Sequence, residues 1–182
     1  MTLLIDRDNR KVIKTKVSLE IHDQYIAGLD CSSKSIHIVL LSLGGKYVTQ
    51  DSFVNISGDM DARMYDLMNQ FKLRFEQKDN FYKHIKVAVV ENPIYVQNVK
   101  ATVGISQVIG AAKEFLNFYT SVFGIDNKSW KKDVVGNGNA SKELIKEFAL
   151  TKWKEMDQTW GQDFFDAACI AFWGVRRFGD GR

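Results

Sequence analysis

Four acidic residues stand at positions where acids are costly, at the ends of segments that are otherwise apolar. Asp30 and Glu91 each end a short apolar run, and Asp163 and Asp166 open an apolar segment further along the chain. Charges at the ends of buried elements need compensation, and a divalent metal is the simplest compensation for three or four carboxylates. Carboxylate oxygens select Mg²⁺ or Mn²⁺ over zinc. A pair of such ions would suit hydrolysis of a phosphodiester.

The elements that carry these acids are of a kind that could bring them together. Alternation along a strand places Gly28 and Asp30 on one face, where the glycine leaves room for a neighbouring element. The i, i+3 spacing of Asp163 and Asp166 places them on adjacent turns of one helix face. That face continues with small residues, so the helix can sit tightly on a sheet. If the strands that end in Asp30 and Glu91 are parallel neighbours, their carboxylates meet beyond the strand ends.

Each acid also has a purely structural explanation. Asp30 could cap a turn, and Glu91 could be an ordinary acid at the end of a strand. Asp163 could be a helix N-cap, and Asp166 a first-turn acid that the helix dipole favours. The joint pattern of the four residues favours a metal site over four separate structural roles.

Hydrophobic periodicity predicts an α/β fold. Apolar runs and hairpin signals predict strands at residues 25–31, 35–43, 46–54, 84–90 and 121–125. Helical spacing predicts helices at residues 59–76, 97–119, from about 139 onward, and 163–178. Residues 126–138 are expected to form a polar loop. A hairpin-built half followed by alternating strands and helices implies a five-stranded mixed sheet with helices on both faces.

Composition sets the class of protein. The chain has 182 residues, 45% of them hydrophobic, and a net charge of +3, which fits one domain with a real core. We expect a basic N-terminal arm at residues 1–24, ending in an edge strand, followed by a domain at 25–182. Cys31 and Cys169 are interpreted as buried reduced thiols. Neither a signal peptide nor a membrane-spanning run is expected, so a cytoplasmic location is the default.

Four segments of the chain carry a resemblance to a known family. They are Ala27-Gly28-Leu29-Asp30, Val89-Val90-Glu91, Val134-Val135-Gly136-Asn137-Gly138 with Ala140-Ser141-Lys142, and Gln162-Asp163-Phe164-Phe165-Asp166-Ala167-Ala168-Cys169-Ile170-Ala171. In their order and spacing they resemble the RuvC family of Holliday junction resolvases, within the RNase H-like superfamily. The resemblance covers roughly residues 25–178.

The resemblance implies a function and roles for particular residues. It implies an RNase H-like endonuclease that uses two Mg²⁺ ions, with Mn²⁺ as a substitute, and leaves 5′-phosphate and 3′-hydroxyl ends. Asp30, Glu91, Asp163 and Asp166 match the family's metal-binding acids. Lys142 matches a lysine near the scissile strand, and it stands in the first turn of a helix, where a cation opposes the dipole. The alternative for Lys142 is a solvated lysine beside Glu143.

The resemblance also implies contacts with DNA. Lys131 matches a second basic position, and Lys132 stands beside it. The family's aromatic wedge is assigned to Tyr95, because Ile94 occupies the expected position. The first aspartate is followed by Cys31-Ser32 where the family usually has Pro-Gly. This departure and the arm 1–24 indicate a divergent member of phage type, from a bacterial or phage-infected cell.

The leading hypothesis is therefore an endonuclease that resolves four-way junctions as a C2 homodimer, with helix 97–119 as the candidate interface. A second hypothesis is a related nuclease that acts on other branched DNA or on RNA/DNA substrates. A third is a protein that binds junctions without cutting them. The four intact acids argue against the third, because anions beside phosphate weaken binding when no metal is present.

Overall fold

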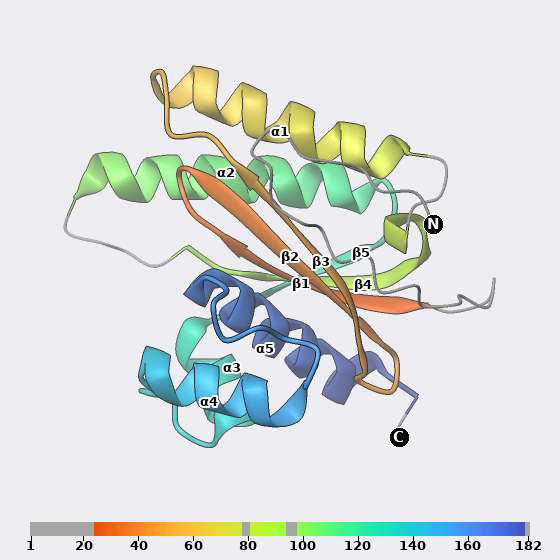
Figure 1. Cartoon of the computed structure of the whole chain (residues 1–182). Coiled ribbons are helices and arrows are strands. Elements are labelled where there is room, and N and C mark those ends of the chain that lie inside the picture. The colour runs from red at the N-terminus through yellow and green to blue at the C-terminus, as the bar shows by residue number, and fades with distance from the viewer. Residues whose placement is uncertain (1–23, 78–80, 94–97, 181–182) are drawn as a thin grey trace.

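Five strands form one mixed sheet in the order β3-β2-β1-β4-β5 (Figure 1). The structure is a computed structural model, and it describes residues 24–77, 81–93 and 98–180. The strands are β1 (Tyr25–Cys31), β2 (Ser35–Ser42), β3 (Tyr47–Val54), β4 (Ile85–Glu91) and β5 (Ser121–Ile125). β1 to β3 form an antiparallel meander, whereas β4 runs parallel to both β1 and β5. The predicted five-stranded mixed sheet is confirmed.

Helices cover both faces of this sheet. They are α1 (Met60–Glu76), α2 (Val99–Asn117), α3 (Asn127–Val135), α4 (Lys142–Lys152) and α5 (Gln162–Phe178), with a short 3₁₀ helix η1 at Phe81–His84. α1 and α2 lie on one face, and α3, α4 and α5 lie on the other (Figure 1). Each face buries its own hydrophobic core, because alternate residues of the central strands point in opposite directions.

α5 lies directly against the centre of the sheet, because small residues line the contact. A Cβ atom at Gly28 of β1 would overlap backbone atoms of Ala167 and Ala171. A Cβ atom at Gly174 would lie 2.7 Å from Cγ2 of Ile26 and 2.8 Å from Cγ2 of Val89. The predicted close approach between the glycine of β1 and the small face of the last helix is therefore present. It fixes the depth at which the acids of α5 stand above β1 and β4.

The structure corrects two predictions about the segment before α5. Residues 127–135 form helix α3 and not a polar loop, because Trp130 and Val134, four residues apart, are both buried against the sheet. α4 begins at Lys142 and not near Asn139. A turn precedes α4, in which the Ala140 N–H donates a hydrogen bond of 3.0 Å to the Asn137 carbonyl. The Ser141 hydroxyl then caps the N-terminus of α4.

Two further expectations concern the N-terminal arm and membrane-spanning segments. The arm 1–24 and its predicted edge strand lie, apart from Gln24, outside the described residues. In the described ranges, no helix has both the length and the apolar character needed to cross a membrane.

Candidate active site

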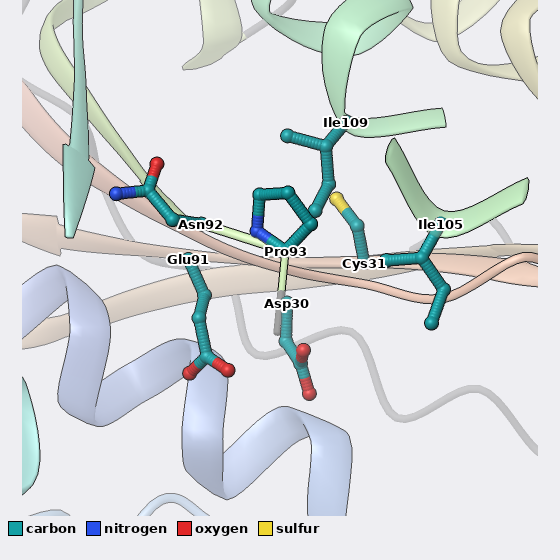
Figure 2. A pocket seen from close by; sticks show the side chains of 7 residues that line it. All are labelled: Asp30, Cys31, Glu91, Asn92, Pro93, Ile105 and Ile109. Carbon is teal, nitrogen blue, oxygen red and sulfur yellow. The ribbon is translucent and has the colours of Figure 1, made fainter. Parts of the chain in front are cut away.

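Asp30 and Glu91 stand side by side at the ends of two parallel neighbouring strands. In the register of β1 and β4, Leu29 is paired with Val90, so the next residues along the two strands are Asp30 and Glu91. Their carboxylates point to the same side of the sheet, toward the blue helix α5 (Figure 2). The condition set by the sequence, that these strands be parallel neighbours, is met.

α5 brings Asp163 and Asp166 to the same place. The helix begins at Gln162 after the N-cap Gly161, so Asp163 is a first-turn residue and not the N-cap. Asp166 is partly buried, and its Oδ1 accepts a hydrogen bond of 3.0 Å from the Gln162 amide. The Asp163 side chain keeps half of its surface exposed, at 50%. The two acids of α5 thus differ in their surroundings, because Asp166 is held by a hydrogen bond within the helix and Asp163 is half exposed.

The charges of the other three acids all act on Asp30. Burial raises the pKa of Asp30 well above its ordinary value, and the negative charges of Asp166, Glu91 and Asp163 raise it further. Lys142 acts on Asp30 in the opposite direction. The site is therefore a partly buried concentration of negative charge that the protein's own cations compensate only in part.

Asp166 has the same kind of surroundings. Burial raises the pKa of Asp166 to about 6, against the opposing effects of the Gln162 hydrogen bond and the positive charge of Lys131. Lys131 and Lys142, two of the predicted basic residues, therefore act on these acids. Lys132 follows Lys131 on α3 and is exposed. Tyr95 lies outside the described residues.

The sequence reasoning missed two residues that contact Glu91. Trp130 donates its indole N–H to Glu91 Oε2 at 2.6 Å. Asn127 donates its amide to Oε1 at 3.0 Å and to Oε2 at 3.1 Å. Both residues lie in the segment 126–138, for which the sequence predicts a polar loop. Their i, i+3 spacing and the apolar pair Trp130 and Val134 are nevertheless typical of a helix.

His37 is a third residue at the site that the sequence did not single out. It lies on β2 directly across from Asp30, and its Nδ1 is 3.5 Å from Asp163 Oδ2. Its ring packs edge-on against Phe164 of α5. Burial lowers the pKa of His37, in spite of the nearby Asp163, so the imidazole is neutral at pH 7.

No protein-family model matches this sequence, and neither does any curated protein. Solved structures do match. The structure of Thermus thermophilus RuvC in complex with a Holliday junction substrate aligns with 84% of this chain and 96% of its own, with a TM-score of 0.63 and 14% identity. The chain has a RuvC-like fold. A second Thermus thermophilus RuvC structure aligns with 81% of this chain and 91% of its own, with a TM-score of 0.57 and 14% identity.

The donor set of this RuvC-like domain fits a hard divalent cation. The charges of Glu91, Asp163 and Asp166 all act on Asp30, with Lys142 as the opposing cation, and carboxylate oxygens are the ligands that Mg²⁺ and Mn²⁺ prefer. Within the described part of the chain, no three His, Cys, Asp or Glu side chains are already arranged as a metal-binding group.

A cavity of about 170 Å³ lies next to the acids of the RuvC-like fold. Asp30 and Glu91 border it, and the residues that line the rest are Cys31, Asn92, Pro93, Ile105 and Ile109. The side chains of Ile105 and Ile109 come from α2, on the side of the sheet opposite the two carboxylates (Figure 2). The end of β1 and β4 therefore presents two carboxylates toward α5, whereas the side toward α2 carries the two isoleucines and Asn92, whose Oδ1 accepts a hydrogen bond of 2.9 Å from Lys113 of α2.

Proposed function

We propose that this RuvC-like protein is a metal-dependent, structure-selective DNA endonuclease that resolves four-way junctions by phosphodiester hydrolysis. The observation that supports the proposal most strongly is the convergence of Asp30 and Glu91, from neighbouring strand ends, with Asp163 and Asp166 on α5. It occurs in a fold similar to that of a RuvC protein bound to a Holliday junction.

In this proposal the four acids hold Mg²⁺, with two ions as the expected number and Mn²⁺ as a substitute. When bound, such a pair of ions lowers the pKa of a water molecule and stabilises charge on the attacking and leaving oxygens. Asp30 and Glu91 bind from the sheet, and Asp163 and Asp166 bind from α5. The neutral His37 beside Asp163 limits the directions that this carboxylate can take.

Three lysines supply the positive charge that a polyanionic substrate needs. Lys142 is exposed in the first turn of α4, where a cation opposes the helix dipole at a cost of about 0.3–1 kcal/mol. A DNA phosphate bound between Lys142 and Asp30's metal would offset that cost. Lys131 and Lys132 bind the DNA backbone beside it, and Tyr95 stacks on an unpaired base.

A four-way junction has two equivalent strands to cut, and a C2 homodimer matches that symmetry. α2 is the proposed interface, since Val99 and Val103 stand one turn apart on it with exposures of 64% and 50%. The proposed location is the cytoplasm of a bacterial or phage-infected cell, as the resemblance implies.

The test is cleavage of a labelled four-way junction in Mg²⁺ by the wild type, by Asp30→Asn and by Asp61→Asn. Asp61 is an exposed acid in the first turn of α1, so its variant is a matched control for the loss of one carboxylate. We expect Asp30→Asn to reduce cleavage by more than about 100-fold, because a metal ligand should matter more than outer-shell partners, whose loss costs 10–100-fold. Equal cleavage by the wild type and Asp30→Asn would refute the site.

The same assay separates the alternatives in substrate. Four-way, three-way, flap and RNA/DNA substrates are compared at equal concentration. If flaps or RNA/DNA hybrids are cut faster than four-way junctions, the protein is a related nuclease with a different substrate. Tight junction binding without cleavage in Mg²⁺ or Mn²⁺ would instead favour a protein that only holds junctions.

A further inference from the structure

Both carboxylate oxygens of Glu91 are bound by donors from a single helix, α3. Trp130 approaches Oε2 at 2.6 Å, and Asn127 approaches Oε1 at 3.0 Å and Oε2 at 3.1 Å. We infer that Trp130 and Asn127 are positioning residues, which fix the Glu91 carboxylate in the orientation that the metal requires. The inference rests on the proposed function, because it assigns Glu91 to the metal.

The topology explains why α3 can reach this carboxylate. β5 runs parallel to β4, and Ile125, its last residue, is paired with Glu91. The chain enters α3 immediately afterwards, through Asp126. The first turn of α3 therefore lies just beyond the end of β4. The i, i+3 spacing of Asn127 and Trp130 then directs both side chains to the same carboxylate.

The contact has the chemistry of an orienting interaction. Trp130 is fully buried, at 0% exposure, so an indole N–H without a partner would be costly. Its partner is a carboxylate oxygen, and charge-assisted hydrogen bonds are about twice as strong as neutral ones. Oε2 already accepts two donors and Oε1 only one, so Oε1 has the larger remaining capacity to accept a further partner.

The alternative is that Trp130 merely fills the core and that its N–H uses the nearest acceptor. A matched pair elsewhere in the molecule separates the two explanations. Trp173 of α5 donates its indole N–H to Asp133 Oδ2 at 2.9 Å, and it is almost completely buried. Asp133 is not one of the four converging acids. Asp133 lies on α3, the helix that also carries Trp130 and Asn127. Trp173→Phe therefore removes the same kind of hydrogen bond to α3 while both donors to Glu91 stay in place.

The experiment compares the wild type, Trp130→Phe, Asn127→Ala and Trp173→Phe in the full-length chain. Mn²⁺ affinity is measured by the EPR signal of the free ion. The kcat and KM for junction cleavage in Mg²⁺ and the Tm are measured in parallel. We expect Trp130→Phe and Asn127→Ala to weaken Mn²⁺ binding by about 10–100-fold, the usual effect of losing an outer-shell partner. Their kcat should fall while KM stays near that of the wild type.

Trp173→Phe should lose as much thermal stability as Trp130→Phe and yet bind Mn²⁺ and cut as the wild type does. Asn127 is only partly buried, so we expect Asn127→Ala to fold. It keeps the test possible if Trp130→Phe fails to fold. Wild-type Mn²⁺ affinity in both Asn127→Ala and a folded Trp130→Phe would overturn the inference, as would a wild type that binds no Mn²⁺. A wild type that binds Mn²⁺ tightly but cuts no branched DNA would refute the proposed function alone, and the Mn²⁺ affinities would still decide the role of α3.

Discussion

Gly28 of β1 and Ala167 of α5 meet backbone to backbone, since a Cβ atom at Gly28 would overlap the Ala167 carbonyl oxygen. This contact sets the distance between the strand that carries Asp30 and the helix that carries Asp163 and Asp166. A residue without a side chain thus sets how closely the acids of α5 approach Asp30.

Gly28→Ala should therefore displace α5. We expect the free energy of unfolding to fall by about 1–3 kcal/mol or more, because the added methyl group meets backbone that cannot move aside cheaply. Urea unfolding followed by circular dichroism measures the change. Gly110→Ala on α2 is the control, because nothing lies within 4 Å of its Cβ position. It should stabilise the helix by about 0.5–1 kcal/mol. An unchanged Gly28→Ala protein would contradict the packing described for α5.

Asp30→Asn should make the metal-free protein more stable. Burial and three neighbouring acids act against the ionised form of Asp30, so removal of its charge relieves them. We expect a higher Tm than that of the wild type in EDTA at pH 7.5, together with loss of the Tm increase that Mg²⁺ gives the wild type. A lower Tm in EDTA would show that the Asp30 carboxylate is a structural partner and not an uncompensated charge.

The effect of Asp166→Asn should depend on pH when metal is removed. The pKa of Asp166 is raised to about 6 by burial, from an ordinary value of 3.8. Because this carboxyl group binds its proton more tightly in the folded state, its contribution to the free energy of unfolding is largest below pH 3.8. That contribution is lost as the pH rises through 6. Asp166→Asn lacks this loss, so its stability advantage over the wild type should be full at pH 7.5 and vanish near pH 4. Thermal melts in EDTA across this range measure it, and a difference independent of pH would be inconsistent with the raised pKa.

Lys142→Met should separate catalysis from folding. We expect cleavage to fall by about 100–1,000-fold, the usual effect of losing one group that stabilises charge on the reacting oxygens, because the positive charge that acts on Asp30 is lost. Stability should be unchanged or higher by about 0.3–1 kcal/mol, because a cation at the start of α4 is unfavourable. Lys83→Met is the control, since Lys83 is exposed in η1, before the opposite end of β4. Full activity of Lys142→Met would favour the alternative of a solvated lysine.

Val103→Asp tests the proposed dimer interface on α2. Because Val103 is half exposed, the change should leave the monomer folded, but it would bury a charge in an α2–α2 contact. Light scattering after size exclusion should show a monomer for Val103→Asp and a dimer for the wild type. Leu144→Asp, on α4 at the other face of the sheet, should remain dimeric. A Val103→Asp dimer of unchanged affinity would exclude this face as the interface.

The sequence was sufficient for the sheet, because its signals are local. The Gly44-Gly45 hairpin, the continuous apolar run of β4 and the helical spacing in α1 and α2 all predicted the observed elements. The meeting of Asp30 and Glu91 depended on one condition, that β1 and β4 be parallel neighbours, and the register satisfies it.

The surroundings of the acids could not be predicted in the same way, because they depend on contacts between residues far apart in the chain. Most residues of α3 are polar, and its helical signal is confined to the buried pair Trp130 and Val134. The same contact joins Trp130 to Glu91, and the pairing of β1 with β2 brings His37 opposite Asp30. Neither relationship has a pattern that a single sequence displays.

The order in which the four acids occur along the chain has a consequence for the cell. Asp30 and Glu91 leave the ribosome long before α5 does, and the sheet alone holds only half of the proposed metal ligands. A chain still being translated would therefore lack a complete cutting centre until residue 178 has emerged and α5 has docked over Gly28. Under the proposed function, we therefore expect no cleavage of DNA by a growing chain before α5 has docked over Gly28.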